Sequence, residues 1–571
     1  QAQIDALPSL EDIQAMSPED QQKAHEKVQA AYDAYNALTD EQKAQITGAE
    51  IFESLFAFFN GLTNTIETLN NVKYLDENGE EQTADNVAVI DNQTAEWSGG
   101  WYVVNSDVEI SDRITVTGDV HLILADGNTL TAKSGIGVDG EGNSLTIYGQ
   151  QEGTGALTAT GYKEGESGIG GRYNENNSGA FTLNGGVVTA QGAGYAAGVG
   201  GGGTNTGGGT ITLNGGRLSA KSVSAASAIG GGAWAGVGLE VVFNGGYVEV
   251  TGNIGAGYDN SDAGSFTTGQ DCDGVLAVSG SIGDTTRQTD WKGVIFQNNA
   301  GKVYGGSVTV GFDWAVPSCA TLTIDPGQSL TLGQGTSFGN GGTIQNNGTL
   351  DVSGALVTAG GTVSGSGSLA KGSQAAPAAG EGYTLDYTAE TLNASSGFEA
   401  AADSAASAGS ASLALTPGSS PYTVWVRRAE NALASASGWT AATIPARPAA
   451  PAVPKVQEKT DTIIRLEWSY GLDYRLEYSL DGIQWESYGS FWGLDPGRTY
   501  TIQARKMATD SSFSSLPASR QVTTLNGDGS GMVQSGETAW VNGNTIQNSG
   551  KIGRASCTGH PHPGPFRRGS F

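Results

Sequence analysis

The feature that most constrains the fold is a sequence repeat with a period of 30 residues. The segments FTLNGGVVTAQG, ITLNGGRLSAKS and VVFNGGYVEVTG begin at Phe181, Ile211 and Val241. The motifs GIGG, GVGG and AIGG recur at the same interval, at 168–171, 198–201 and 228–231. Each repeat holds three short strand-like segments between glycine-rich corners, too short for a helical hairpin. The pattern predicts a mainly β chain built on a right-handed parallel β-helix with coils of about 30 residues.

The Asn-Gly-Gly motif of each repeat is predicted to be architectural. Asparagines at equivalent positions of neighbouring coils can stack, so that their side-chain amides form a ladder of hydrogen bonds. The glycines that follow can adopt φ > 0 and turn the chain sharply. A structural corner must recur in every coil, whereas a catalytic motif need not. The residues concerned are Asn184, Asn214 and Asn244 in the ladder, and Gly185, Gly215 and Gly245 in the turns.

The repeat region and the segments before it resemble parts of known surface proteins. GWYVVNSDVEISDRITVTGDVHLILADGNTLTA and NSLTIYGQ lead into the repeats. Together they resemble the β-helical region of large modular surface proteins from gut Firmicutes, which is often labelled carbohydrate-binding. AYDAYNALTDEQKAQITGAE resembles the small helical modules on the N-terminal side of Gram-positive surface proteins. These resemblances imply an extracellular or cell-surface location.

A second resemblance lies nearer the C-terminus. IIRLEWSYGLDYRLEYSLDGIQWESY and GLDPGRTYTIQARK resemble a fibronectin type III sandwich. The resemblance assigns Trp468 to the sandwich core and Tyr500 to the tyrosine corner, so both are expected to serve packing. The upstream segments YTLDYTAETLNA and YTVWVRRAEN look like a shorter relative of the same sandwich.

Composition shifts divide the chain into five segments. GSGSLAKGSQAAPAAGEG (365–382) suits a linker, and TIPARPAAPAV (443–453) is predicted to be a hinge. The first segment has a helix start at Ser17-Pro18 and an apolar stripe that includes Phe52 and Leu55. The predicted segments are a helical domain (1–70), a parallel β-helix with a leading cap (71–375), a β-sandwich-like module (376–447), a fibronectin type III-like domain (448–524) and a tail with the composition of a truncated or disordered end (525–571).

The overall charge argues against one class of partner. Acidic residues outnumber basic ones 58 to 29, for a net charge of −29. Nucleic-acid-binding proteins carry basic surfaces, so we expect no nucleic-acid partner. The chain contains no apolar run long enough to cross a membrane. Three cysteines and four histidines supply little material for a metal site, and no cofactor is expected.

Catalytic groups were sought by aligning the repeats. In the 30-residue register Arg217 falls beside Val187 and Tyr247, and no column of carboxylates forms. We therefore assign no catalytic residue. Four acids near the end of the regular repeats are candidate calcium ligands, although solvated aspartates in glycine-rich turns are the preferred interpretation. They are Asp259, Asp262, Asp271 and Asp273.

Two classes of function are consistent with these features. The preferred one is a non-catalytic binding or adhesion protein whose β-helix contacts a polysaccharide, a host glycan or a host protein. Its candidate glycan-binding rings are Tyr195, Trp234, Tyr247 and Tyr258, although Trp234 could instead cap the core. The alternative is a polysaccharide lyase or glycoside hydrolase on a pectin-lyase-like β-helix, with its site in the irregular coils after Asp259.

Overall fold

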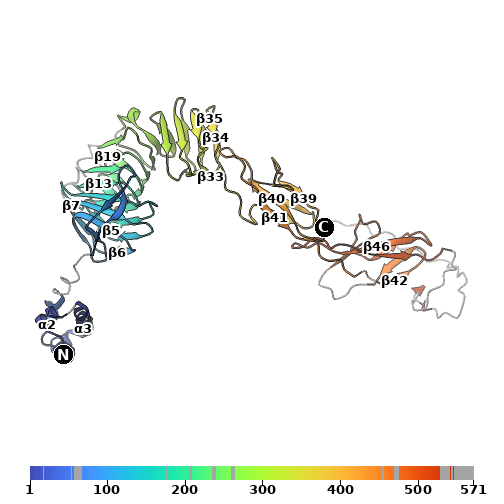
Figure 1. Cartoon of the computed structure of the whole chain (residues 1–571), viewed down its shortest axis with the longest axis horizontal. Helices are drawn as coiled ribbons and strands as arrows, with labels where there is room; N and C mark the ends of the chain where they lie inside the picture. Colours follow the sequence, from blue (N-terminus) through green and yellow to red (C-terminus); the bar gives the residue numbers. More distant parts are fainter. Residues whose placement is uncertain are drawn as a thin grey trace. The chain divides into compact units, whose positions relative to one another are not determined.

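The computed structural model describes residues 1–16, 18–49, 51–52, 54–56, 67–174, 178–204, 209–234, 239–258, 264–283, 285–452, 455–467, 475–527, 540–541 and 544–545. The chain is mainly β, as the sequence predicts, and its longest sheets are parallel (Figure 1). It divides into two compact units, Gln1–Gly372 and Ser373–Phe571. Within the described residues, no helix combines the length and the apolar character needed to cross a membrane.

Four short helices form near the N-terminus. They are α1 (Ala2–Asp5), α2 (Leu10–Gln14), α3 (Pro18–Asn36) and α4 (Asp40–Lys43). Helix α3 begins at Pro18, as predicted, because the missing N–H of proline costs nothing in a first turn. The buried side chains Ile13, Val28, Phe52 and Leu55 share one small apolar core. The apolar stripe recognised in the sequence therefore faces this core.

Two long sheets make up the first parallel stack. The leading strands are β1 (Thr68–Leu69), β2 (Val72–Leu75), β3 (Glu81–Ala84), β4 (Val87–Val89), β5 (Glu96–Val104), β6 (Val108–Ile110), β7 (Ile114–Leu124), β8 (Thr129–Ala132) and β9 (Ile136–Gly137). Each following repeat contributes one strand to each of three rows. The first row is β10 (Ser144–Tyr148), β13 (Ala180–Leu183), β16 (Thr210–Leu213), β19 (Glu240–Phe243) and β22 (Ser265–Thr268). The second is β11 (Ala156–Thr160), β14 (Val187–Gln191), β17 (Arg217–Lys221), β20 (Tyr247–Thr251) and β23 (Val275–Val278), and the third is β12 (Ile169–Gly170), β15 (Val199–Gly200), β18 (Ile229–Gly230) and β21 (Ile254–Gly255).

The rows are joined by the leading strands. The long strand β7 pairs with β9 at its start and with β10 at its end, so the first and third rows belong to one sheet. The second row forms the other sheet with β6 and β8. Side chains that point inward stack in register, as Phe181, Ile211 and Val241 do, and each is at most 3% exposed. The alternation of buried and exposed residues along each strand thus gives one continuous core.

Glycine in the third row is required by close backbone approach. Gly170, Gly200 and Gly230 lie directly above one another with φ between 125° and 127°. A Cβ on Gly200 would lie 2.2 Å from the carbonyl oxygen of Gly230. A side chain is excluded twice, by the backbone angle and by the next coil. This explains why the Gly-Gly corner recurs once per repeat.

A β-hairpin ends the first stack. Strand β23 pairs in parallel with β24 (Gly293–Gln297), but β24 pairs antiparallel with β25 (Ala300–Tyr304). The turn between β24 and β25 places Asn298 and Asn299 at φ 50° and 66°, as a tight hairpin turn of type I′ requires. The direction of the strands in this sheet therefore reverses at the hairpin.

The core also changes to the other face of the sheet at this hairpin. Leu276 and Ile295 are paired and belong to the core of the first stack. On the same face, the partner of Ile295 across the hairpin is Lys302, which is exposed. On the opposite face Glu249 is exposed, whereas Phe296 is 2% exposed. The two stacks thus share one sheet but bury opposite sides of it.

The second parallel stack has shorter coils. Thr321 pairs with Thr343 and Thr343 with Thr362, so the offset falls to 22 and then 19 residues. Its strands are β26 (Ser307–Val310), β27 (Trp314–Val316), β28 (Thr321–Ile324), β29 (Ser329–Leu332), β30 (Ser337–Asn340), β31 (Thr343–Asn346), β32 (Thr349–Asp351), β33 (Leu356–Ala359), β34 (Thr362–Ser364) and β35 (Ser368–Ala370). This change of period explains why the repeat becomes hard to follow in the sequence after about 262.

The second unit contains pairs of three-stranded antiparallel sheets. One pair is β36 (Tyr383–Asp386), β37 (Thr391–Ala394) and β39 (Ser412–Ala414) with β38 (Phe398–Ala401), β40 (Tyr422–Arg428) and β41 (Thr440–Ile444). The other is β42 (Val456–Lys459), β43 (Ile463–Leu466) and β45 (Ser490–Trp492) with β44 (Leu476–Ser479), β46 (Thr499–Lys506) and β47 (Ala518–Thr523). A two-stranded sheet, β48 (Trp540–Val541) and β49 (Asn544–Thr545), follows. Each pair encloses its own apolar core. Trp468 lies outside the described residues.

The Pro-Ala segment at 443–453 is packed in place, which differs from the hinge expected there. Arg447 donates to the Pro417 carbonyl at 2.9 Å and to the Ser514 carbonyl at 3.1 Å. Phe513 is 1% exposed and packs its ring on Tyr387. Side chains from beyond the segment thus enter the core that precedes it, and these contacts restrict bending.

Candidate functional site

Aromatic side chains gather at the glycine-rich corners of the first stack. Of nine large hydrophobic side chains that are exposed among the described residues, five lie in the segments next to the third row of strands. These are Tyr162, Tyr173, Val223, Trp234 and Tyr258. Exposed apolar groups that cluster in this way mark a contact surface more often than scattered ones do.

Four rings from successive coils form what we call the aromatic corner: Tyr173, Tyr195, Trp234 and Tyr258. The rings of Tyr195 and Trp234 have centroids 4.3 Å apart at an interplanar angle of 49°. Trp234 is 40% exposed, so it does not cap the core, and Tyr258 is 67% exposed. Tyr173, which is 47% exposed, was not among the rings selected from the sequence.

Small residues in the backbone let these rings approach one another. A Cβ on Gly203 would lie 2.7 Å from Cδ2 of Tyr173, so only glycine leaves room for that ring. One coil further on, the backbone N–H of Trp234 donates to the Gly203 carbonyl at 3.4 Å. A Cβ on Gly257 would lie 3.0 Å from Cα of Ala233. Because Ala233 precedes Trp234 and Gly257 precedes Tyr258, those two rings begin from adjacent coils.

Tyr247, the fourth ring selected from the sequence, lies elsewhere. It projects from β20 on the outer face of the second row, paired with Arg217 of β17. The Arg217 guanidinium carbon is 4.6 Å from the centroid of the Tyr247 ring. Burial raises the pKa of the Tyr247 hydroxyl. Arg217 therefore covers this ring, which makes Tyr247 a poor stacking surface for a ligand.

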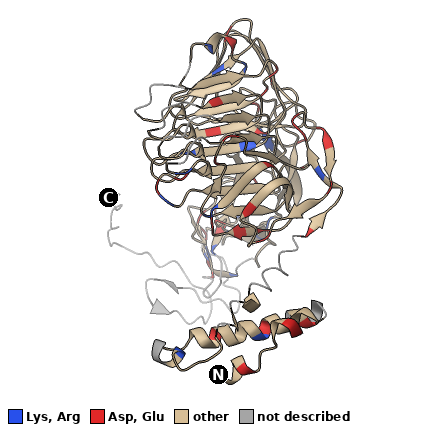
Figure 2. Ribbon diagram, turned by 90° about the vertical axis from the view of Figure 1, so that its left-hand side faces the viewer, with Lys and Arg blue, Asp and Glu red and all other residues tan. Residues whose placement is uncertain are grey.

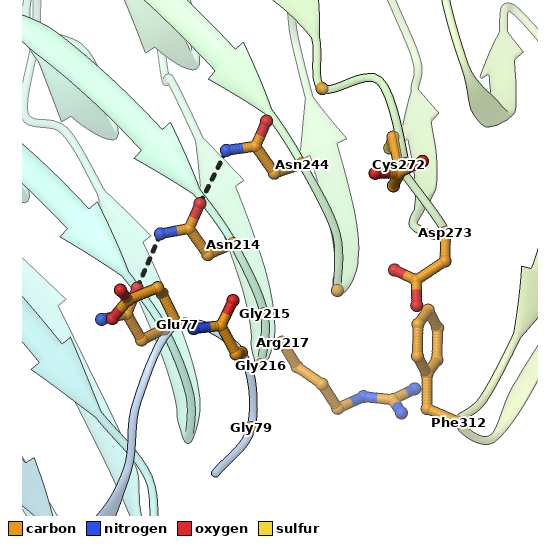
Figure 3. Close-up of a pocket in the computed structure, with 15 residues that line it drawn as sticks. Glu77, Gly79, Asn214, Gly215, Gly216, Arg217, Asn244, Cys272, Asp273 and Phe312 are labelled. Atoms are coloured by element: carbon orange, nitrogen blue, oxygen red, sulfur yellow. Dashed lines mark hydrogen bonds between the residues drawn. The ribbon is translucent and has the colours of Figure 1, made fainter.

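The asparagines of the three repeats form a hydrogen-bonded ladder. Asn214 Nδ2 donates to Asn184 Oδ1 at 2.8 Å, and Asn244 Nδ2 donates to Asn214 Oδ1 at 2.7 Å (Figure 3). Of the two glycines that follow Asn214, only Gly216 has positive φ, 69°. Gly215 serves close approach, since a Cβ there would lie 2.5 Å from the Asn184 carbonyl oxygen. The same holds for Gly245 with Asn214, and Gly185 lies against Gly149.

The ladder forms one wall of a cleft of about 670 Å³, which we call the ladder cleft. Arg217, Asp271 and Asp273 line it from the first stack, and Phe312 lines it from the start of the second. Figure 3 shows the Asn214 and Asn244 amides on one side and Arg217, Phe312 and Asp273 on the other. Glu77, from the turn between β2 and β3, also lines the cleft. The cleft exists because the core changes face, which places the second stack against the outer surface of the first.

Arg217 joins the two stacks at the cleft. Its Nη1 donates to the carbonyl oxygen of Asp313 at 3.0 Å while the guanidinium lies over Tyr247. The guanidinium is thus held on one side by a ring and on the other by the backbone next to Phe312. Its position is fixed before any ligand arrives.

The acids of the cleft differ in environment. Burial against the cleft wall raises the pKa of Asp273, opposed in part by a backbone hydrogen bond. The neighbouring thiol of Cys272 is 4% exposed, and burial raises its pKa to about 12. The candidate calcium ligands Asp271 and Asp273 both line the cleft, whereas Asp259 and Asp262 lie outside the described residues. No group of three or more acidic, cysteine or histidine side chains in the described part of the chain is arranged to hold a metal ion.

Charged side chains do not align along the first stack. In the second row, Ser219 pairs with Glu249 and Lys221 with Thr251. Figure 2 shows Lys, Arg, Asp and Glu scattered among uncharged residues over these strands. His121, the histidine of β7, is stacked on Trp101 at 4.5 Å and contacts the Tyr148 hydroxyl at 3.1 Å. Catalysis by repeated acid columns therefore finds no support among these residues.

Comparison with known proteins adds no family assignment. No protein-family model matches the chain. No curated protein matches it either.

Sequence inspection missed three members of these sites. Tyr173 belongs to a coil whose neighbour carries glycine instead of an aromatic residue, so no column of rings is visible in the repeats. Phe312 and Glu77 come from segments outside the 30-residue repeat. Only the position of Arg217 one coil before Tyr247 was visible, because both lie within the repeat.

Proposed function

We propose that the first unit carries a right-handed parallel β-helix, and that the chain is a non-catalytic binding or adhesion protein at the cell surface or outside the cell. Strand pairing in register once per repeat supports the β-helix. Parallel crossovers are right-handed in nearly all proteins. At the β24–β25 hairpin the strand direction and the core face both reverse, so the sense of winding is unchanged.

The remaining modules fit a surface protein built as a row of domains. We infer a helical domain at 1–70 and β-sandwiches at 376–447 and 448–524, the latter of fibronectin type III type. The Tyr500 hydroxyl accepts a hydrogen bond from the Asp495 backbone N–H at 2.7 Å, and the Tyr422 hydroxyl accepts one from Thr416 at 2.9 Å. Such links to the backbone a few residues upstream are typical of a tyrosine corner.

The observation that carries the binding proposal is the aromatic corner. Ring faces stack on the C–H surfaces of sugars, and they do so without ionisable groups. Exposed rings from adjacent coils are about 4.8 Å apart along the stack, the spacing of neighbouring strands. We propose that this surface binds an extended polysaccharide, a host glycan or a glycosylated host protein.

The test is a glycan-array screen followed by affinity measurements on the full chain. We expect micromolar to millimolar affinity for at least one glycan and no release of reducing ends. Trp234→Ala should weaken binding about tenfold, a loss of about 1.4 kcal/mol. The matched control is Trp492→Ala, because Trp492 is equally an exposed tryptophan, 61% exposed, but belongs to the second unit. Equal binding by both variants would refute the proposal.

One observation favours a second candidate, a polysaccharide lyase or hydrolase. Asp273 lies in a cleft beside Arg217, and its raised pKa is the property that a general acid needs. The measurement is reducing-end or unsaturated-product release by the dialysed protein. Turnover that disappears in Asp273→Asn would establish this candidate in place of simple binding.

A further inference from the structure

We propose that the ladder cleft is a second binding site, separate from the aromatic corner, and that it takes a neutral oligosaccharide along the asparagine ladder. The inference does not rest on the function proposed for the aromatic corner, because the two surfaces share no residue. It rests on the construction of the cleft, the hydrogen-bonding capacity of the ladder, and the charge of the lining.

The cleft is held in shape by contacts that are independent of any ligand. Arg217 fixes the segment that carries Phe312 through the Asp313 carbonyl. At the other end, the backbone N–H of Leu75 donates to the Gly149 carbonyl at 2.9 Å, which fixes the hairpin that carries Glu77. The volume of about 670 Å³ lies within the range of small-molecule sites.

The ladder retains hydrogen-bonding groups after its internal bonds are made. A side-chain amide has two N–H donors and an oxygen with two lone pairs. Asn214 uses one N–H toward Asn184 and one lone pair toward Asn244, so one of each remains. Successive amides therefore present a donor and an acceptor every 4.8 Å or so. Sugar hydroxyls, which donate and accept, are the groups that match such an alternating wall.

The opposite wall supplies the other elements of a saccharide site. Phe312 offers a ring, and Arg217 and Asp273 offer a fixed donor and an acceptor (Figure 3). An aromatic ring combined with a few convergent polar groups is the usual composition of a small-molecule pocket. The three groups face the ladder across the cleft, so a bound chain would contact both walls.

The charge of the lining selects among saccharides. Three acids, Glu77, Asp271 and Asp273, line the cleft with one cation, Arg217. A uronate or sulfated chain would bring further negative charge close to these carboxylates, and like charges at short range repel. The cleft therefore favours neutral saccharides over acidic ones.

The experiment measures binding of small probes to the full chain by calorimetry and saturation-transfer NMR. The probes are the neutral tetrasaccharides of xylose, glucose, mannose and N-acetylglucosamine, the acidic tetragalacturonate, and tetralysine as a cationic peptide. We expect at least one neutral tetrasaccharide to bind with a Kd below about 1 mM and tetragalacturonate to bind at least about tenfold more weakly. Asp273→Ala and Phe312→Ala should each weaken the neutral ligand about tenfold or more, whereas Trp234→Ala should leave its affinity unchanged.

The matched control is Glu249→Gln, which removes one negative charge from the same face of β20 without lining the cleft. If Phe312→Ala unfolds, Asp273→Ala decides the question, because its side chain is exposed at the cleft. The proposal is overturned if no neutral tetrasaccharide binds, if tetragalacturonate or tetralysine is preferred, or if Glu249→Gln weakens binding as much as Asp273→Ala. Binding that depends on Trp234 alone would support the aromatic corner and overturn the cleft.

Discussion

Replacing the central asparagine of the ladder tests how the repeats are held together. Asn214 makes two ladder bonds, at 2.8 and 2.7 Å, whereas Asn184 and Asn244 each make one. A buried hydrogen bond contributes about 0.5–1.5 kcal/mol net. The amides face the cleft, so partners left behind can bond to water. We therefore expect Asn214→Ala to cost about 1–2 kcal/mol, and Asn184→Ala or Asn244→Ala about half as much.

The assay is hydrogen exchange of the full chain, followed by mass spectrometry of peptides from β16 and β19. It reports local opening, which suits a chain with several domains, where a single unfolding transition is not expected. A cost of about 1–2 kcal/mol makes protected amides exchange about 5- to 30-fold faster. Exchange at the wild-type rate in Asn214→Ala, or equal acceleration in Asn184→Ala and Asn214→Ala, would refute the ladder as a source of stability.

Two further predictions concern stability. Gly200→Ala places a Cβ 2.2 Å from the Gly230 carbonyl oxygen at φ 125°, so it should abolish the cooperative melting of the first unit; Gly306→Ala, at φ 86° with no atom within 4 Å, should lower the melting temperature only slightly. Asp273 has a raised pKa in the folded state, so the folded protein binds more protons than the unfolded chain between the ordinary carboxyl pKa and the raised one, and stability falls as pH rises through that window. Asp273→Asn should therefore melt above wild type at pH 7 and at the same temperature near pH 3, and a melting difference that is independent of pH would contradict this account.

The first stack could be predicted because its coils have equal length. When Phe181, Ile211 and Val241 recur every 30 residues, pairing in register follows from the alternation of strand side chains. The same periodicity placed Asn184, Asn214 and Asn244 in one line. A regular array thus turns sequence spacing directly into contact.

The clefts and corners were harder to predict because they depend on departures from the period. The Asn298-Asn299 turn signals a hairpin, but the sequence does not show that the core will change face there. Without that change, Phe312 could not be placed near Arg217, about a hundred residues earlier in the chain. Tyr173 was missed for a related reason, because its ring fills the space over a glycine of the next coil, and an absent side chain leaves no apolar signal.

The shared sheet at the β24–β25 hairpin has a consequence for how such a chain can change over evolutionary time. Each stack has its own core and its own period, about 30 residues before the hairpin and 19 to 22 after it. Duplication or deletion of one whole coil would leave every neighbouring coil with a partner of matching length. Because the two cores lie on opposite faces, such a change in one stack would not disturb the packing of the other. The hairpin thus allows two arrays of unequal period to gain or lose coils independently while remaining one continuous body.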